Sequence, residues 1–143
     1  MRLAASLRYA LYAAAVLLLL SGALWLAVRY GTALGPRERR LLAVSMRIHG
    51  AATMAMLVLA GCAVALHAPA GWRERRNMTS GTALGGVLLL LTLTGYLLYY
   101  VGDDAPRAIA SAVHWIAGIA AAAALVWHVA EARRAAAGRT PPD

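Results

Sequence analysis

The fold is decided by residues 108–131, which read AIASAVHWIAGIAAAAALVWHVAE. A run of about 20 apolar residues is long enough to cross a bilayer as an α-helix. This run carries no charge before Glu131, but it holds two histidines, His114 and His128. Ionisable side chains inside a membrane helix are costly and are usually retained for a function. Because about 14 residues bring an α-helix back to within about 40° of the same face, both histidines point toward one neighbour.

The composition of the whole chain agrees with a membrane location. The 143 residues are 62% hydrophobic and 14% charged, which indicates one integral membrane domain, residues 1–143, and not a soluble core. The net charge of +8 comes entirely from arginines, which lie at the ends of the apolar runs, where membrane proteins place them. We therefore predict membrane lipid as a partner and no nucleic acid.

Four apolar runs predict an all-α fold with helices at about 9–28, 41–68, 82–101 and 108–131. The basic start of the chain resembles a secretory signal, but we expect the first run to be a retained membrane helix. Pro69 and Gly71 are predicted to end the second helix, and Cys62 to be a small buried packing residue. Short connections between four helices favour an up-down-up-down bundle.

The distribution of arginines predicts the orientation of this bundle. The side with both termini carries Arg2, Arg8, Arg73, Arg75, Arg76, Arg133, Arg134 and Arg139. The other side carries Arg29, Arg37, Arg39, Arg40 and Arg107, with Arg47 just inside the second helix. Positive residues favour the cytoplasmic side, so we predict a multi-pass protein of the bacterial inner (plasma) membrane with both termini in the cytoplasm.

The other two histidines lie together on the second predicted helix. His49 and His67 are 18 residues apart, which is five turns at about 3.6 residues per turn, so they share a face. The second and fourth helices run in the same direction, so His49 lies near the depth of His114, and His67 near that of His128. Two imidazoles that face each other across a bundle can take both axial positions of a haem iron. The spacings within each helix, about 27 Å and 21 Å, fit two haems.

Glycines on the partner helices fit the same interpretation. Gly22 and Gly95 are predicted near the depth of the His49–His114 pair, and Gly85 and Gly86 near that of the other pair. A glycine lets a ring edge approach the backbone, although glycines also serve ordinary packing of membrane helices. Candidate partners for haem propionates are Arg8, Arg29 and Arg73.

At this point the chain resembles a known group, the small di-haem cytochrome b subunits of formate dehydrogenase, thiosulfate reductase and nickel–iron hydrogenase. The likeness is carried by four membrane helices with RIHG at 47–50, VHWIAG at 113–118 and WH at 127–128. It implies two non-covalent haems b with His49, His114, His67 and His128 as axial ligands. One departure is that ligands in that group are often spread over three helices, and here they occupy two.

The resemblance also implies a function: electron transfer between a quinone pool and a partner redox subunit, either a cytochrome or an iron–sulfur protein. The chain would then be an electron-transfer subunit and not a stand-alone enzyme. Candidates for a quinone site are Tyr30, Ser45 and Arg47 on one side and Trp72 and Asn77 on the other. Two alternatives stay open: a metal-ion or proton transporter that uses the intramembrane histidines, and a purely structural assembly subunit.

Overall fold

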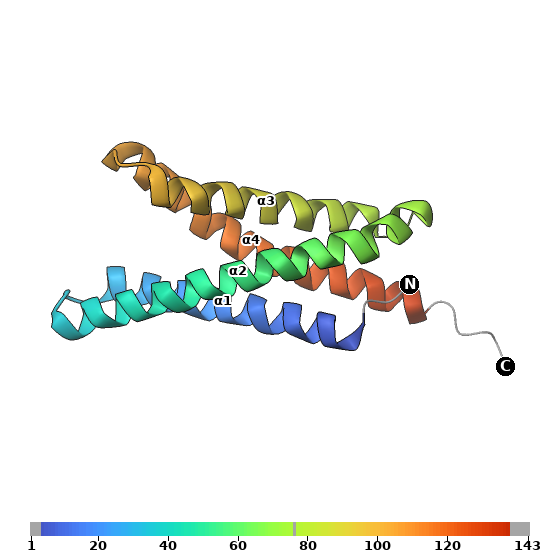
Figure 1. Cartoon of the computed structure of the whole chain (residues 1–143), viewed down its shortest axis with the longest axis horizontal. Coiled ribbons are helices and arrows are strands. Elements are labelled where there is room, and N and C mark those ends of the chain that lie inside the picture. Colours follow the sequence, from blue (N-terminus) through green and yellow to red (C-terminus); the bar gives the residue numbers. More distant parts are fainter. Residues whose placement is uncertain (1–3, 76, 138–143) are drawn as a thin grey trace. The chain divides into compact units, whose positions relative to one another are not determined.

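The computed structural model describes residues 4–75 and 77–137, and these residues form four long helices (Figure 1). They are α1 (Ala5–Gly31), α2 (Pro36–Arg73), α3 (Met78–Tyr100) and α4 (Asp104–Ala137). The predicted all-α class is confirmed. α1 packs along α2, and α3 packs along α4. The chain divides into two compact units, one for each helix pair, Met1–Glu74 and Arg75–Asp143, and the single domain stays a prediction.

The first pair is held along a seam of small residues at seven-residue intervals. Ala14, Ser21 and Val28 are the buried residues of α1, and Ser45 and Ala52 are those of α2. A period of seven keeps one stripe of each helix against its partner when two helices wind gently around each other. Small side chains on that stripe let the two backbones approach closely, which is how helices associate in a membrane.

The second pair uses the same spacing. The buried residues of α4, Ala110 and Ala117, are seven residues apart, and those of α3, Ser80 and Thr94, are twice seven apart. The two α3 residues are both hydroxylic and almost inaccessible, at 0% and 5% exposure. Burying a hydroxyl without a hydrogen bond is costly, so each of these side chains must have a partner within the pair.

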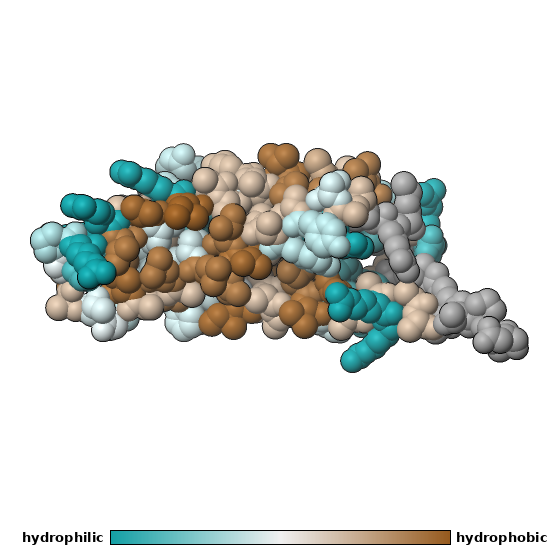
Figure 2. Space-filling view, turned by 90° about the horizontal axis from the view of Figure 1, so that it is seen from below, coloured by the Kyte–Doolittle hydropathy of each residue, from teal (hydrophilic) through white to brown (hydrophobic). Residues whose placement is uncertain are grey.

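All four helices are long and apolar enough to cross a membrane. Large apolar side chains such as Met54, Val58, Leu89 and Val126 are exposed, which is the arrangement expected of a surface that faces lipid tails. On the face seen in Figure 2, hydrophobic side chains follow the middle of the helices and hydrophilic ones gather toward their ends. The predicted multi-span membrane protein is thus supported by length and composition.

Each helix extends beyond its apolar run, because polar residues continue the backbone hydrogen bonding. α2 begins at Pro36, not at about 41, since proline at the first helical position gives up an N–H that has no helical partner there. α3 begins at Met78, four residues earlier than predicted. α4 begins at Asp104, where a carboxylate in the first turn is favoured by the helix dipole.

Two predictions about α2 are wrong. The helix does not end at Pro69 and Gly71 but continues to Arg73, because a proline one turn before the end removes a single hydrogen bond and the last turn closes without it. Cys62 is exposed and not buried, because the seam of this pair is taken by residues at seven-residue spacing such as Ser45 and Ala52.

Candidate functional site

Three of the four histidines are hydrogen-bonded through Nδ1 to a hydroxyl on the neighbouring helix of the same pair. In the first unit, the Nδ1 of His49 lies 2.9 Å from the Oγ of Ser21. In the second unit, the Nδ1 of His114 lies 2.9 Å from the Oγ1 of Thr94, and that of His128 lies 3.1 Å from the Oγ of Ser80. The histidines are half-buried, and the hydroxyls are the buried seam residues described above.

Each of these hydroxyls also has an acceptor for its own proton. Ser21 donates to the carbonyl oxygen of Leu17 at 2.6 Å, and Thr94 donates to that of Leu90 at 2.8 Å. Ser80 instead donates to the carboxylate of Glu131 on α4. Since a hydroxyl has one proton and two lone pairs, all three can serve as acceptors toward the histidine ring.

A glycine follows each hydroxyl and lies against the same imidazole. A Cβ at Gly22 would lie 3.5 Å from the Cε1 of His49, and one at Gly95 would lie 3.4 Å from the Cε1 of His114. The proximity of these two glycines to their predicted histidines is therefore observed, and their role beside a haem stays a prediction.

The third glycine differs from the prediction. A Cβ at Gly81 would lie 3.5 Å from the Cε1 of His128, whereas one at Gly85 or Gly86 would meet nothing within 4 Å. Gly81 lies just outside the third predicted helix, which begins at about 82, so the apolar pattern gives no signal for it. α3 in fact begins one turn earlier, at Met78. Gly81, the glycine at the depth of His128, therefore lies in the first turn of α3.

The register between α3 and α4 explains why the hydroxyl–histidine contact occurs twice in the second unit. Thr94 and Ser80 are 14 residues apart on α3, and their partners His114 and His128 are 14 residues apart on α4. In antiparallel helices that wind around each other, about 14 residues make four turns of 3.5 residues on both helices. The two hydroxyl–histidine contacts are thus repeats of one contact along a single seam.

His67 lies 18 residues beyond His49 on α2 and is half-buried. The predicted pairing of His49 with His114, and of His67 with His128, joins residues of different units and stays a prediction.

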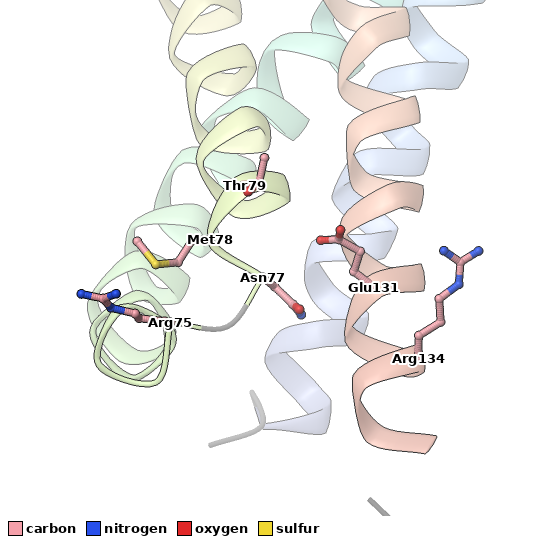
Figure 3. Close-up of a pocket in the computed structure, with 6 residues that line it drawn as sticks. All are labelled: Arg75, Asn77, Met78, Thr79, Glu131 and Arg134. Carbon is pink, nitrogen blue, oxygen red and sulfur yellow. The ribbon is translucent and has the colours of Figure 1, made fainter. Parts of the chain in front are cut away.

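An open pocket of about 550 Å³ lies in the second unit beside the start of α3 (Figure 3). It is lined by Arg75, Asn77, Met78, Thr79, Glu131 and Arg134. In Figure 3, Asn77 and Glu131 extend toward each other, and Arg134 extends from the far side of α4. Glu131 therefore has two environments: its carboxylate accepts from buried Ser80, and it borders a space open to the surroundings.

The other predicted candidates differ in their exposure. Tyr30 and Trp72 are 71% and 66% exposed, Arg29 stacks over the ring of Tyr30, and Arg47 is exposed. Ser45, in contrast, is 1% exposed and donates its hydroxyl proton to the carbonyl of Leu42. Its burial on the seam makes it a packing residue, and Asn77 is the quinone candidate that borders a pocket.

Comparison with known proteins found no matching family model, no matching curated protein and no matching solved structure.

Proposed function

We propose that this chain is a four-span membrane cytochrome b. Two non-covalent haems b would each be held by two histidines, His49 with His114 and His67 with His128. The pairing follows from helix direction and from the depth of each histidine along its apolar run. Gly22 and Gly95 would leave room beside the first pair.

The observation that supports this proposal best is the hydroxyl at the Nδ1 of three intramembrane histidines. A histidine that binds a metal generally donates its other ring N–H to a partner in its surroundings, which orients the ring and fixes its tautomer. Any half-buried histidine needs a partner for its N–H, but the same ring atom, Nδ1, meets a hydroxyl three times, on two separate helix seams. The residues present therefore fit a group that takes imidazole ligands.

A bound haem would supply one-electron chemistry, and the chain's own residues would hold it in an apolar setting from which water is excluded. Two histidines on each iron would leave no position for oxygen or substrate, so the function is electron transfer and not catalysis on a substrate. By its resemblance, the chain would connect a quinone pool with a partner redox subunit, a cytochrome or an iron–sulfur protein, in the inner membrane with both termini cytoplasmic.

A haem assay on the purified full-length chain tests this proposal. We expect a pyridine haemochrome spectrum with about two haems b per polypeptide, because there are two histidine pairs and the chain has one cysteine and no C-x-x-C-H attachment motif. His49→Ala and His114→Ala serve as matched variants, and each should lower the haem content to about one. A chain that binds no haem after expression with haem supplied would contradict the proposal, and a value of one would remove one pair.

One observation favours a second candidate, a path for protons or divalent ions. The contacts from His128 through Ser80 to Glu131 link an apolar-segment histidine to a carboxylate that borders an open pocket. Chains of histidine and acidic residues are typical of proton relays in membrane proteins. Proteoliposomes would separate the two candidates: a haem-free chain that carries protons, and loses this activity in Glu131→Gln, would favour the second.

A further inference from the structure

Three dipeptides in this chain consist of a serine or threonine followed by a glycine: 21–22, 80–81 and 94–95. Each of them contacts a histidine in the structure, and there are no others in the sequence. In each, the hydroxyl meets Nδ1 and the glycine faces Cε1, the ring carbon between the two nitrogens. Three occurrences of one arrangement, on two separate helix seams, indicate a common purpose.

The heavy-atom contacts determine which atom carries each proton. At Ser21, the Oγ lies 2.6 Å from the carbonyl oxygen of Leu17, and two oxygens approach this closely only with a proton between them. The carbonyl has none, so the hydroxyl donates it. The contact of the same Oγ with Nδ1 of His49 at 2.9 Å then needs a second proton, which only the ring nitrogen can supply.

The same reasoning applies in the second unit. Thr94 gives its proton to Leu90, so His114 donates from Nδ1. Ser80 gives its proton to Glu131, which as a carboxylate can only accept, so His128 also donates from Nδ1. A neutral imidazole has one N–H, and its other nitrogen carries the lone pair. In all three histidines that nitrogen is Nε2.

We infer that Ser21, Ser80 and Thr94 are positioning residues that hold His49, His128 and His114 in the Nδ1–H tautomer, so that Nε2 of each carries the lone pair that binds iron. The inference rests on the proposed function in one respect, because a bound haem is what would use the lone pair of Nε2. The assignment of the tautomers rests on the hydrogen bonds alone. The glycine contributes by letting the ring lie against the backbone of the neighbouring helix. Since the glycine contacts are 3.4–3.5 Å, an alanine would just touch the ring and a larger residue would displace it.

The tautomers can be measured in the haem-free full-length chain. Nitrogen NMR of the chain labelled with ¹⁵N-histidine, in detergent, distinguishes Nδ1–H from Nε2–H for each residue, with assignments from single histidine variants. We expect Nδ1–H at His49, His114 and His128. Ser21→Ala should convert His49 to a mixture with Nε2–H and leave the others unchanged. Thr94→Val should do the same to His114, and Ser80→Ala to His128.

Matched controls separate positioning from packing. Ser45→Ala removes a buried hydroxyl of α2 that donates to its own helix, and Thr92→Val removes an exposed one two residues from Thr94; neither should change a tautomer. Ser21→Thr and Thr94→Ser keep the hydroxyl and should keep the wild-type signal. If Ser21→Ala fails to fold, Ser21→Cys keeps the volume with a weak acceptor and should give the same loss.

The haem-loaded chain gives a second readout. The g-values of the low-spin ferric signal should change for one haem component in each of Ser21→Ala, Ser80→Ala and Thr94→Val, and in neither control. Unchanged tautomers in all three variants would overturn the inference even if two haems bind. A wild-type chain that binds no haem would overturn the proposed function, while the tautomers would still decide whether the hydroxyls orient the rings.

Discussion

Ser80 differs from the other two hydroxyls in the nature of its acceptor. Ser21 and Thr94 donate to backbone carbonyls, which are neutral, whereas Ser80 donates to the carboxylate of Glu131. A charged acceptor makes a stronger hydrogen bond than a neutral one. The negative charge of Glu131 therefore acts on the imidazole of His128 through Ser80. The imidazole of His128 is more strongly polarised than those of His49 and His114, whose hydroxyl partners donate to neutral carbonyls.

This difference predicts unequal haem potentials. An electron-rich imidazole stabilises ferric iron, because hydrogen bonding to a ligand tunes its basicity and the metal's potential. Ser80→Ala and Glu131→Gln should both raise the midpoint potential of the haem that His128 would bind, and of that haem alone. If a variant weakened the stabilisation of the ferric over the ferrous state tenfold, the midpoint potential would rise by about 59 mV. A redox titration followed by absorbance measures the change, with Ser45→Ala as the control; equal shifts in both haems would contradict it.

The proximity of two glycines to their histidines could be predicted from the sequence, because it depends only on depth along the apolar runs. Gly22 and Gly95 lie against the histidines predicted for them. The hydroxyls could not be predicted in the same way, because serine and threonine in a membrane helix ordinarily bond the carbonyl three or four residues back. Ser21 and Thr94 make that bond too, and their second contact depends on the register between two helices.

At the scale of helices, seven-residue spacing of small residues sets which faces meet. The sequence shows the alanines of α4, but many of them could form a seam, since residues 120–124 are all alanine. The structure selects Ala110 and Ala117. The ends of the helices were less predictable, because hydropathy detects the apolar run and not the polar turn that continues it. The predicted start of the third helix therefore left out Ser80 and Gly81, which lie in the first turn of α3.

The buried stripe of α4 predicts that a larger side chain lowers the stability of the protein at some positions of this helix and not at others. Ala117 is 5% exposed, and Ala120 is exposed on another face. Ala117→Leu should lower the free energy of unfolding by about 1–3 kcal/mol, because overpacking forces the helices apart, whereas Ala120→Leu should leave it nearly unchanged. Unfolding in detergent followed by circular dichroism compares the two variants. Equal stability would mean that α3 and α4 do not pack along the stripe that contains Ala117.

At the scale of the whole molecule, the proposed haem pairs need both helix pairs of the chain. Within each unit, the contacts of the neighbouring helix orient histidines that lie on one helix, α2 or α4. Neither unit supplies two histidines on facing helices, so the described contacts orient single ligands, and a complete ligand pair would come from α2 and α4 together. The predicted pairing compares spacings of 18 residues in α2 and 14 in α4, and it stays a prediction because it joins residues of different units.

Replacing the histidines one at a time tests the pairing in the full-length chain. His49→Ala and His114→Ala should each remove the same component of the reduced absorption spectrum, and His67→Ala and His128→Ala should each remove the other. The bundle should survive each change, because small and apolar residues make most of its seams. If His49→Ala shared its phenotype with His128→Ala, the depth argument would be wrong, because a pair at one membrane surface would then combine the start of one apolar run with the end of the other. If all four variants kept the wild-type spectrum, the histidines would not be the ligands.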